Sequence, residues 1–121
     1  MTDKSYEEQV ADAKTRIREV TAEEALTARR DGGDAVFLDV RRPDEWHLFR
    51  IPGATWVPLD RLDESVTATI PRDRRVVVYC ARGNRSALAA DAMQGYGYTD
   101  VASLAGGIIA WAHAGGEIDD A

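Results

Sequence analysis

The segment Arg75 to Cys80, with the sequence RVVVYC, is the feature that most restricts the fold of this chain. Three consecutive valines favour an extended backbone, and an apolar run without polar alternation suits a strand that is buried on both faces. Such strands are typical of parallel sheets that helices cover on both sides. Because further apolar runs alternate with amphipathic segments, the sequence predicts an α/β fold around a mostly parallel sheet.

The other expected elements follow from local patterns. Tyr6 to Val20 is predicted to form one helix, because apolar residues recur at spacings of three and four. Thr21 to Glu24 matches a capping box that opens a second helix, which ends near Gly32. Further strands are expected at 35–38, 55–57 and 100–104, and further helical segments at 43–47, 59–70, 86–95 and 108–113.

The 121 residues fit one domain. We expect an N-terminal helical extension over residues 1–20, the main domain over residues 21–116, and a frayed acidic tail over residues 117–121. The extension has two interpretations. It is either a helix packed on its own domain, as amphipathic helices usually are, or a docking surface for another protein.

Charge and composition exclude several classes of partner. A net charge of −6 disfavours nucleic acid, whose phosphates would be repelled. No apolar run approaches the roughly 18 residues of a membrane span, so we expect no membrane partner. Met1 to Gln9 is polar and acidic, unlike a signal or transit peptide. A single cysteine forms no internal disulfide, and we therefore expect a cytoplasmic protein.

Cys80 directly follows the predicted buried strand and precedes a short loop and a helix. Ligand sites in parallel α/β sheets lie at the carboxyl ends of strands, where amides of a loop and a helix N-terminus converge on an anion. The same field favours the thiolate, which is the reactive form of cysteine. Gly83 allows a sharp backbone path, and Arg82 and Arg85 add positive charge. A cysteine in this place can also be an inert core residue, but the glycine and the arginines favour a nucleophile.

The segment Cys80-Ala-Arg-Gly-Asn-Arg-Ser86 resembles the active-site loop of rhodanese domains, which is commonly cysteine-x-x-glycine-x-arginine-serine. Two further segments agree, in the expected order along residues 21–116. Residues 38–41, 45–46 and 51–54 (LDVR, EW and IPGA) resemble the N-terminal signature of the family, and residues 104–107 and 110–111 (LAGG and AW) resemble its C-terminal signature.

The resemblance implies a rhodanese-like fold with a central five-stranded parallel sheet flanked by helices. It also implies that Cys80 takes a sulfur atom from a small anionic donor, thiosulfate or a persulfide, and passes it to a thiol or a protein acceptor. The residues that would bind the resulting persulfide are Ala81, Arg82, Gly83, Asn84 and Arg85. Asp39 and Ser86 would support the site, and neither a metal nor an organic cofactor is implied.

Three functions are compatible with this resemblance. The first is an enzyme that turns over thiosulfate, and the second is a carrier module that relays persulfide sulfur between proteins with little thiosulfate turnover. The third, a non-catalytic regulatory domain, is disfavoured by the presence of Cys80. Phosphatases and arsenate reductases use a cysteine-x5-arginine loop. Here the arginine is Arg85, one residue too early, and position 86 is Ser86.

Several neighbouring residues have two interpretations. Phe49 and Arg50 replace a glycine-histidine pair that is usual in the family, which reflects either loop variation or an altered rim where Arg50 attracts anions. Asp39 is either a catalytic carboxylate or, as we expect, a brace for neighbouring loops. Trp111 is expected to fill the core, and Gly106 with Gly107 to form a tight turn.

Overall fold

The computed structural model describes residues 4–120. The strands are β1 (Arg18–Val20), β2 (Val36–Asp39), β3 (Phe49–Arg50), β4 (Thr55–Trp56), β5 (Val76–Tyr79), β6 (Val101–Leu104) and β7 (Asp119–Asp120). The helices are α1 (Tyr6–Lys14), α2 (Ala22–Arg30), α3 (Pro43–Leu48), α4 (Leu62–Thr69), α5 (Asn84–Gly95) and α6 (Gly107–His113), with a 3₁₀ turn η1 at Leu59–Arg61. No described helix is long and apolar enough to cross a membrane.

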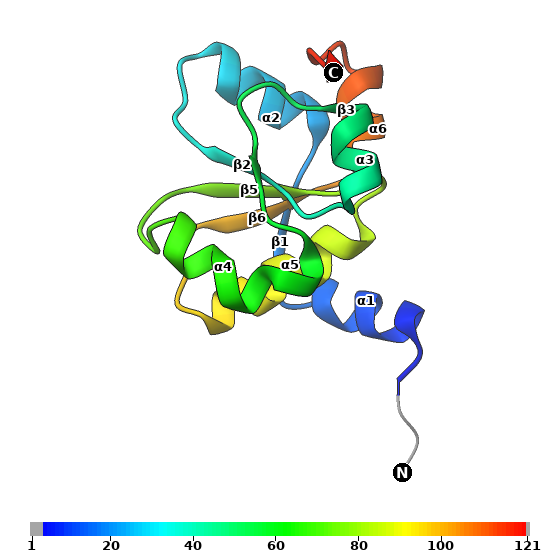
Figure 1. Cartoon of the computed structure of the whole chain (residues 1–121), viewed down its shortest axis with the longest axis vertical. Coiled ribbons are helices and arrows are strands. Elements are labelled where there is room, and N and C mark those ends of the chain that lie inside the picture. Colours follow the sequence, from blue (N-terminus) through cyan, green and yellow to red (C-terminus); the bar gives the residue numbers. More distant parts are fainter. Residues whose placement is uncertain (1–3, 121) are drawn as a thin grey trace.

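Five of the strands form one sheet in the order β1-β6-β5-β2-β4, with every neighbouring pair parallel (Figure 1). Helices α1, α4 and α5 lie on one side of this sheet, and α2 and α6 lie on the other (Figure 1). The predicted α/β fold with a five-stranded parallel sheet flanked by helices is therefore confirmed. The central strand β5 is buried at all four positions, as the RVVVYC pattern indicates.

The predicted N-terminal helix is wrong in its second half. α1 ends at Lys14, and residues 18–20 form β1, which pairs with β6 so that Val20 lies opposite Leu104. The open edge of β6 provides backbone partners there, and this tertiary pairing overrides a weak helical pattern. Residues 1–20, expected to be a helical extension, therefore supply an edge strand to the sheet. Residues 1–3 of that segment lie outside the described residues.

Helix α1 packs against α5. Val10 and Ala13 are its buried residues, and just beyond its end the guanidinium of Arg16 binds Asp91 of α5 through Nε and Nη2, at 2.9 and 2.8 Å. The Gln94 side chain of α5 also donates to the carbonyl of Arg16, at 3.1 Å. Val10 and Ala13 of α1 are thus covered by the domain, whereas Tyr6 at the start of the helix stays exposed.

The C-terminal tail, which is expected to fray, contacts the rest of the domain. β7 pairs antiparallel with β3, and the carbonyl of Glu117 accepts a 2.8 Å hydrogen bond from Nε1 of Trp111. Trp111 is 1% exposed, so its indole N–H needs an internal acceptor, and the tail supplies one. This bond and the strand pair attach residues 117–120 to the rest of the domain. Ala121 lies outside the described residues.

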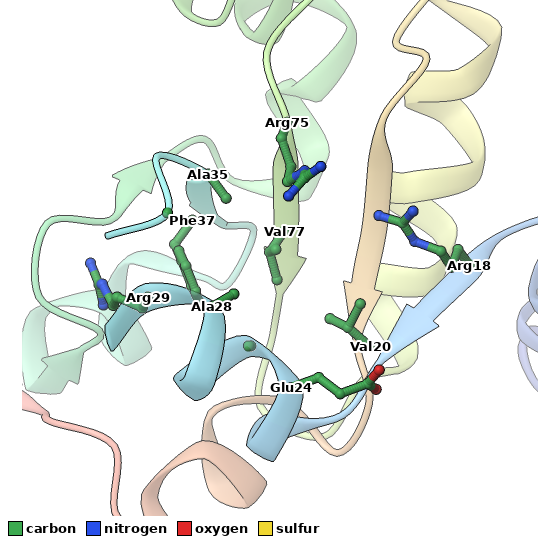
Figure 2. Close-up of a pocket in the computed structure, with 11 residues that line it drawn as sticks. Arg18, Val20, Glu24, Ala28, Arg29, Ala35, Phe37, Arg75 and Val77 are labelled. Carbon is green, nitrogen blue, oxygen red and sulfur yellow. The ribbon is translucent and has the colours of Figure 1, made fainter. Parts of the chain in front are cut away.

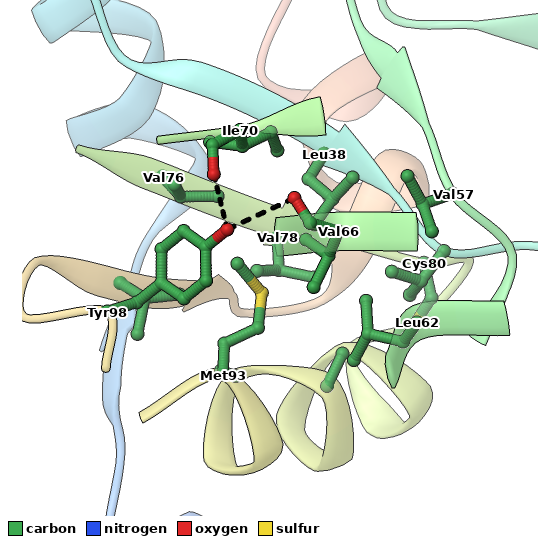
Figure 3. Packing of buried hydrophobic residues seen from close by; sticks show 14 residues of the cluster. Leu38, Val57, Leu62, Val66, Ile70, Val76, Val78, Cys80, Met93 and Tyr98 are labelled. Carbon is green, nitrogen blue, oxygen red and sulfur yellow. Dashed lines mark hydrogen bonds between the residues drawn. The ribbon is translucent and has the colours of Figure 1, made fainter. Parts of the chain in front are cut away.

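Two hydrophobic clusters fill the spaces between the layers. Cys80 belongs to the cluster under α4 and α5, together with Leu62, Val78 and Met93 (Figure 3). Tyr98 closes the far end of this cluster, with its hydroxyl at the carbonyls of Val66 and Ile70 (Figure 3). The second cluster, under α2 and α6, contains Leu26, Phe37, Tyr79, Leu104, Ile108 and Trp111.

A buried ion pair organises the chain after β2. Asp39 and Arg41 are 0% and 1% exposed, and Nη2 of Arg41 lies 2.8 Å from Oδ2 of Asp39. The backbone N–H of Arg41 donates to Oδ1 of Asp39 at 2.8 Å, and its Nη2 also donates to the carbonyl of Phe49 at 2.6 Å. The pair therefore connects the end of β2 to β3.

Removing one member of this pair should be strongly destabilising. Asp39→Ala leaves the Arg41 guanidinium buried without a compensating charge, so we expect the free energy of unfolding to fall by about 3 to 5 kcal/mol. Chemical denaturation followed by circular dichroism measures this difference. Asp44→Ala removes an exposed partner of Arg42 and is the matched control, with an unchanged midpoint expected. Equal effects of the two substitutions would contradict the structural role of Asp39.

Candidate active site

Cys80 lies immediately after β5, at the carboxyl end of a central strand. Helix α5 begins at Asn84, two positions before the expected start at Ser86. The cause is Gly83, the N-cap residue, whose φ of +98° turns the chain sharply into the helix. Asn84, Arg85 and Ser86 therefore belong to the first turn of α5, and its N-terminus faces the Cys80 side chain.

Backbone amides surround the sulfur atom of Cys80. The N–H of Gly83 donates to Sγ at 3.1 Å and the N–H of Ser86 at 3.4 Å. The Ser86 hydroxyl lies 3.5 Å from the same sulfur. Amides of a loop and of a helix N-terminus place partial positive charge where they converge. The arrangement suits a sulfur atom that carries negative charge, inside a residue that is only 1% exposed.

The loop after Cys80 is bound on its other side by the start of α6. The N–H groups of Ile108 and Ile109 donate to the carbonyls of Cys80 and Ala81, at 2.9 and 3.3 Å. This contact is very close, because a Cβ atom on Gly107 would lie 2.4 Å from the carbonyl carbon of Ala81. The glycine pair expected to form a tight turn thus also lets α6 approach the loop.

Arg85 is held by a carboxylate from α3. Its Nη1 and Nη2 atoms lie 2.7 and 3.0 Å from the two carboxylate oxygens of Glu45. Hydrogen bonds from Arg85 lower the pKa of Glu45 to about 2, and the carboxylate in turn raises the pKa of Arg85. In the sequence, Glu45 is recognisable only as part of a segment that resembles a family signature. Its pairing with Arg85 joins positions 40 residues apart, which no local pattern indicates.

Arg82 and Arg50 have different surroundings. Arg82 is exposed, and no described carboxylate forms an ion pair with it. Arg50 lies over the ring of Trp46, with 4.7 Å from its guanidinium carbon to the ring centroid, and its Nε donates to the carbonyl of Trp46 at 3.2 Å. Trp46 stacks in turn on Trp56. The structure thus places Arg50 on an aromatic surface formed by α3 and β4.

Two cavities differ in their relation to this loop. One of about 500 Å³ lies beside Arg85 and is bordered by the segments after β2 and β4, including Arg42, Pro43, Pro58 and Leu59. Another, of about 270 Å³, lies between α2 and the sheet and reaches Arg18 and Arg75, which stand at the amino ends of their strands (Figure 2). Only the first lies at the carboxyl ends of the strands, where Cys80 is.

Comparison with known proteins agrees with this architecture. The family model of the rhodanese-like domain matches residues 21–114. The chain belongs to the rhodanese-like domain family. The resemblance inferred from the three sequence segments is thus confirmed. Over the described residues, no three His, Cys, Asp or Glu side chains form a group suited to a metal ion.

Several relatives of this rhodanese-like chain are described as sulfurtransferases. It is 36% identical over 99 residues to a sulfurtransferase of Allochromatium vinosum, covering 82% of this chain and 92% of that protein. It is 40% identical over 82 residues to the probable adenylyltransferase/sulfurtransferase MoeZ of Mycobacterium tuberculosis, covering 67% of this chain. The match covers only 21% of MoeZ. A tRNA uridine(34) hydroxylase of Citrobacter koseri is 32% identical, over 72% of this chain and 26% of its own.

Solved structures give the same fold. A thiosulfate sulfurtransferase from Pseudomonas aeruginosa aligns with a TM-score of 0.81 and 32% identity, covering 93% of this chain and 22% of that one. A protein of unknown function from Rhodopseudomonas palustris, described as a possible tyrosine phosphatase, aligns with a TM-score of 0.85 and 31% identity, covering 98% and 97%.

The ion pair with Arg85 predicts that the Glu45 carboxyl titrates at an unusually low pH. The pKa of Glu45 is lowered from 4.5 to about 2 in the folded chain. The stabilisation from this pair is therefore complete above the unfolded-state value and is lost as the pH falls through the folded-state value. Arg85→Met removes the main cause and should raise the carboxyl midpoint towards its ordinary value. Side-chain carbon NMR measures both midpoints.

A control separates this pair from the general charge of the protein. Lys4→Met removes a positive charge that pairs with Asp12 on α1, and it should leave the Glu45 midpoint unchanged. A Glu45 midpoint that stays low in Arg85→Met would show that another group lowers this pKa.

Proposed function

We propose that this chain is a sulfurtransferase that carries a sulfane sulfur on Cys80 as a persulfide. The main supporting observation is the pair of amides, from Gly83 and Ser86, that lie 3.1 and 3.4 Å from Sγ. The family relation to sulfurtransferases, including one that the chain matches over 92% of its length, supports the same reaction class. The same amides are suited to a thiolate and to the negative charge of a persulfide.

The proposed reaction has two displacement steps. The Cys80 thiolate attacks the outer sulfur of thiosulfate, the sulfur–sulfur bond of the donor breaks, and its electron pair leaves with sulfite. An acceptor thiolate, or cyanide in an assay, then attacks the outer sulfur of the Cys80 persulfide and regenerates the Cys80 thiolate. A persulfide donor follows the same course, with a thiolate as the leaving group. No oxidant or reductant is consumed.

The proposed roles of the other residues follow from their places around Cys80. Ala81, Arg82, Gly83, Asn84 and Arg85 form the loop and first helical turn that would bind the outer sulfur. Ser86 would donate its hydroxyl hydrogen to the Cys80 sulfur, and Asp39 would act through Arg41 as a brace. The exposed guanidinium of Arg82 is suited to attract an anionic donor. A lone thiol with these properties favours a reducing cytoplasm as the location.

The loop length argues against phosphate as the substrate. Four residues separate Cys80 from Arg85, whereas phosphatase loops place five between them. Both terminal nitrogens of Arg85 are also engaged by Glu45. The Rhodopseudomonas palustris protein is described as a possible tyrosine phosphatase. We therefore do not propose that function for this chain.

A carrier module is the second candidate. The region shared with MoeZ is only 21% of that longer protein. In MoeZ, the segment similar to this chain therefore accompanies other parts of the protein. A carrier would receive sulfur from a partner protein and show little turnover of thiosulfate. The packing of α1 on α5 gives no added support, because the buried residues of α1 face its own domain. The identity of the donor distinguishes the two candidates.

Mass spectrometry of the intact protein tests the proposed reaction. After treatment with thiosulfate, we expect the wild type to gain the mass of one sulfur atom and to lose it on addition of cyanide. Cys80→Ser should show neither change, because the protein has a single cysteine. A gain only from a low-molecular-weight persulfide would favour the carrier module. No adduct from either donor would refute the proposal.

A phosphatase assay provides the complementary control. With para-nitrophenyl phosphate as the substrate, we expect no turnover above the rate of Cys80→Ser. Cys80-dependent release of nitrophenol would show that the argument from loop length is wrong.

A further inference from the structure

A second buried hydroxyl lies behind the sulfur atom. Ser103 on β6 is 0% exposed, and its Oγ lies 2.8 Å from Oγ of Ser86, which is also 0% exposed. Ser86 Oγ in turn lies 3.5 Å from the sulfur of Cys80. Three side chains from β6, α5 and the end of β5 therefore form a continuous chain of polar atoms inside the protein.

The direction of these hydrogen bonds follows from counting acceptors. Over residues 4–120, the Ser103 hydroxyl has one hydrogen-bond partner, Ser86 Oγ. Ser86 Oγ has two partners within reach, Ser103 Oγ and the Cys80 sulfur. If Ser86 donated to Ser103, the O–H of Ser103 would be buried without an acceptor, which is unfavourable. A thiolate at Cys80 can only accept, so in that state the O–H of Ser103 donates to Ser86 and the O–H of Ser86 donates to the sulfur.

We infer that Ser103 is a positioning residue for sulfur transfer, because its hydroxyl orients the Ser86 hydroxyl towards the Cys80 sulfur. This inference rests on the proposed function of Cys80. A hydrogen bond to a charged sulfur is stronger than one to a neutral thiol, and a hydroxyl that also accepts a hydrogen bond is a better donor. Ser103 therefore favours the thiolate, both as the attacking group and as the group released when the acceptor takes the sulfur.

Charged groups near the loop also act on the Cys80 sulfur, and a substitution at Ser103 leaves them unchanged. They are Arg82 and Arg85 on the loop and α5, Glu45 on α3, and the Asp39–Arg41 pair after β2. β6 brings no ionisable side chain, and the titratable residue of α6, His113, lies in the last turn of that helix. On α4, Asp63 is exposed to solvent.

The pH dependence of alkylation by iodoacetamide tests the inference. Cys80 is the single cysteine, so the rate reports the thiolate of this residue without any sulfur donor. Ser103→Ala should move the midpoint of the pH–rate profile upward by about half a unit, which slows alkylation about threefold well below the midpoint. Ser86→Ala should move it by about one unit, because the direct hydrogen bond is lost.

A double-mutant cycle makes the test specific. If Ser103 acts through Ser86, the substitution Ser103→Ala should cause no further shift in the Ser86→Ala background. Ser103→Thr keeps the hydroxyl and should restore the wild-type profile. Val101→Ala, at a buried position on the same strand, should lower the melting temperature and leave the profile unchanged.

The outcomes distinguish this inference from the proposed function. The positioning role would be overturned if Ser103→Ala left the pH–rate profile unchanged. It would also be overturned if Ser103→Ala shifted the midpoint equally in the wild type and in Ser86→Ala. Both results would count even if wild-type Cys80 forms a persulfide. Failure of persulfide formation is measured separately by mass spectrometry. A profile shift in Val101→Ala as large as that in Ser103→Ala would also overturn the role, because it would assign the effect to general loosening of β6.

Discussion

The geometry around Cys80 depends on one backbone contact, in which the first turn of α6 binds the carbonyl groups of the loop. The N–H groups of Ile108 and Ile109 occupy the carbonyls of Cys80 and Ala81. With its carbonyls satisfied on the α6 side, the loop presents N–H groups on the opposite side, towards the sulfur. The contact needs a residue without a side chain at Gly107, and it needs β6 to deliver α6 beside β5. Sheet order, turn chemistry and the sulfur environment are therefore parts of one arrangement.

The polarity of the candidate site comes mainly from backbone dipoles. The protein has a net charge of −6, and the charge of Arg85 is matched by Glu45. Two amides and a hydroxyl remain close to the sulfur of Cys80. Such groups are fixed in direction and need no reorganisation when charge moves from sulfur to a leaving group. Backbone groups of this kind suit an anionic sulfur atom even in an acidic protein, and Arg85 connects α5 with α3.

Much of this architecture was predictable from the sequence, and the failures have physical causes. The buried strand β5, the capping box at Thr21 and the loop after Cys80 are local patterns, and each is formed by consecutive residues. β1 was missed because a three-residue edge strand depends on pairing with β6. β7 was missed because its order depends on the indole of Trp111 and on β3. The contacts of Arg85 with Glu45 and of Ser86 with Ser103 join distant positions on different elements, which only the folded chain brings together.

The burial of Cys80 bears on the rate at which sulfur is passed to an acceptor. A thiol that is 1% exposed exchanges with large molecules only when the surrounding structure opens. On the proposed mechanism, a protein acceptor approaches the outer sulfur atom from the side of the loop that presents its N–H groups, opposite α6. The lifetime of the stored sulfur then depends on how often the structure around Cys80 opens, as well as on the reactivity of the sulfur–sulfur bond. Delivery to a protein acceptor would then depend on local opening of the site, whereas a small acceptor such as cyanide needs less of it.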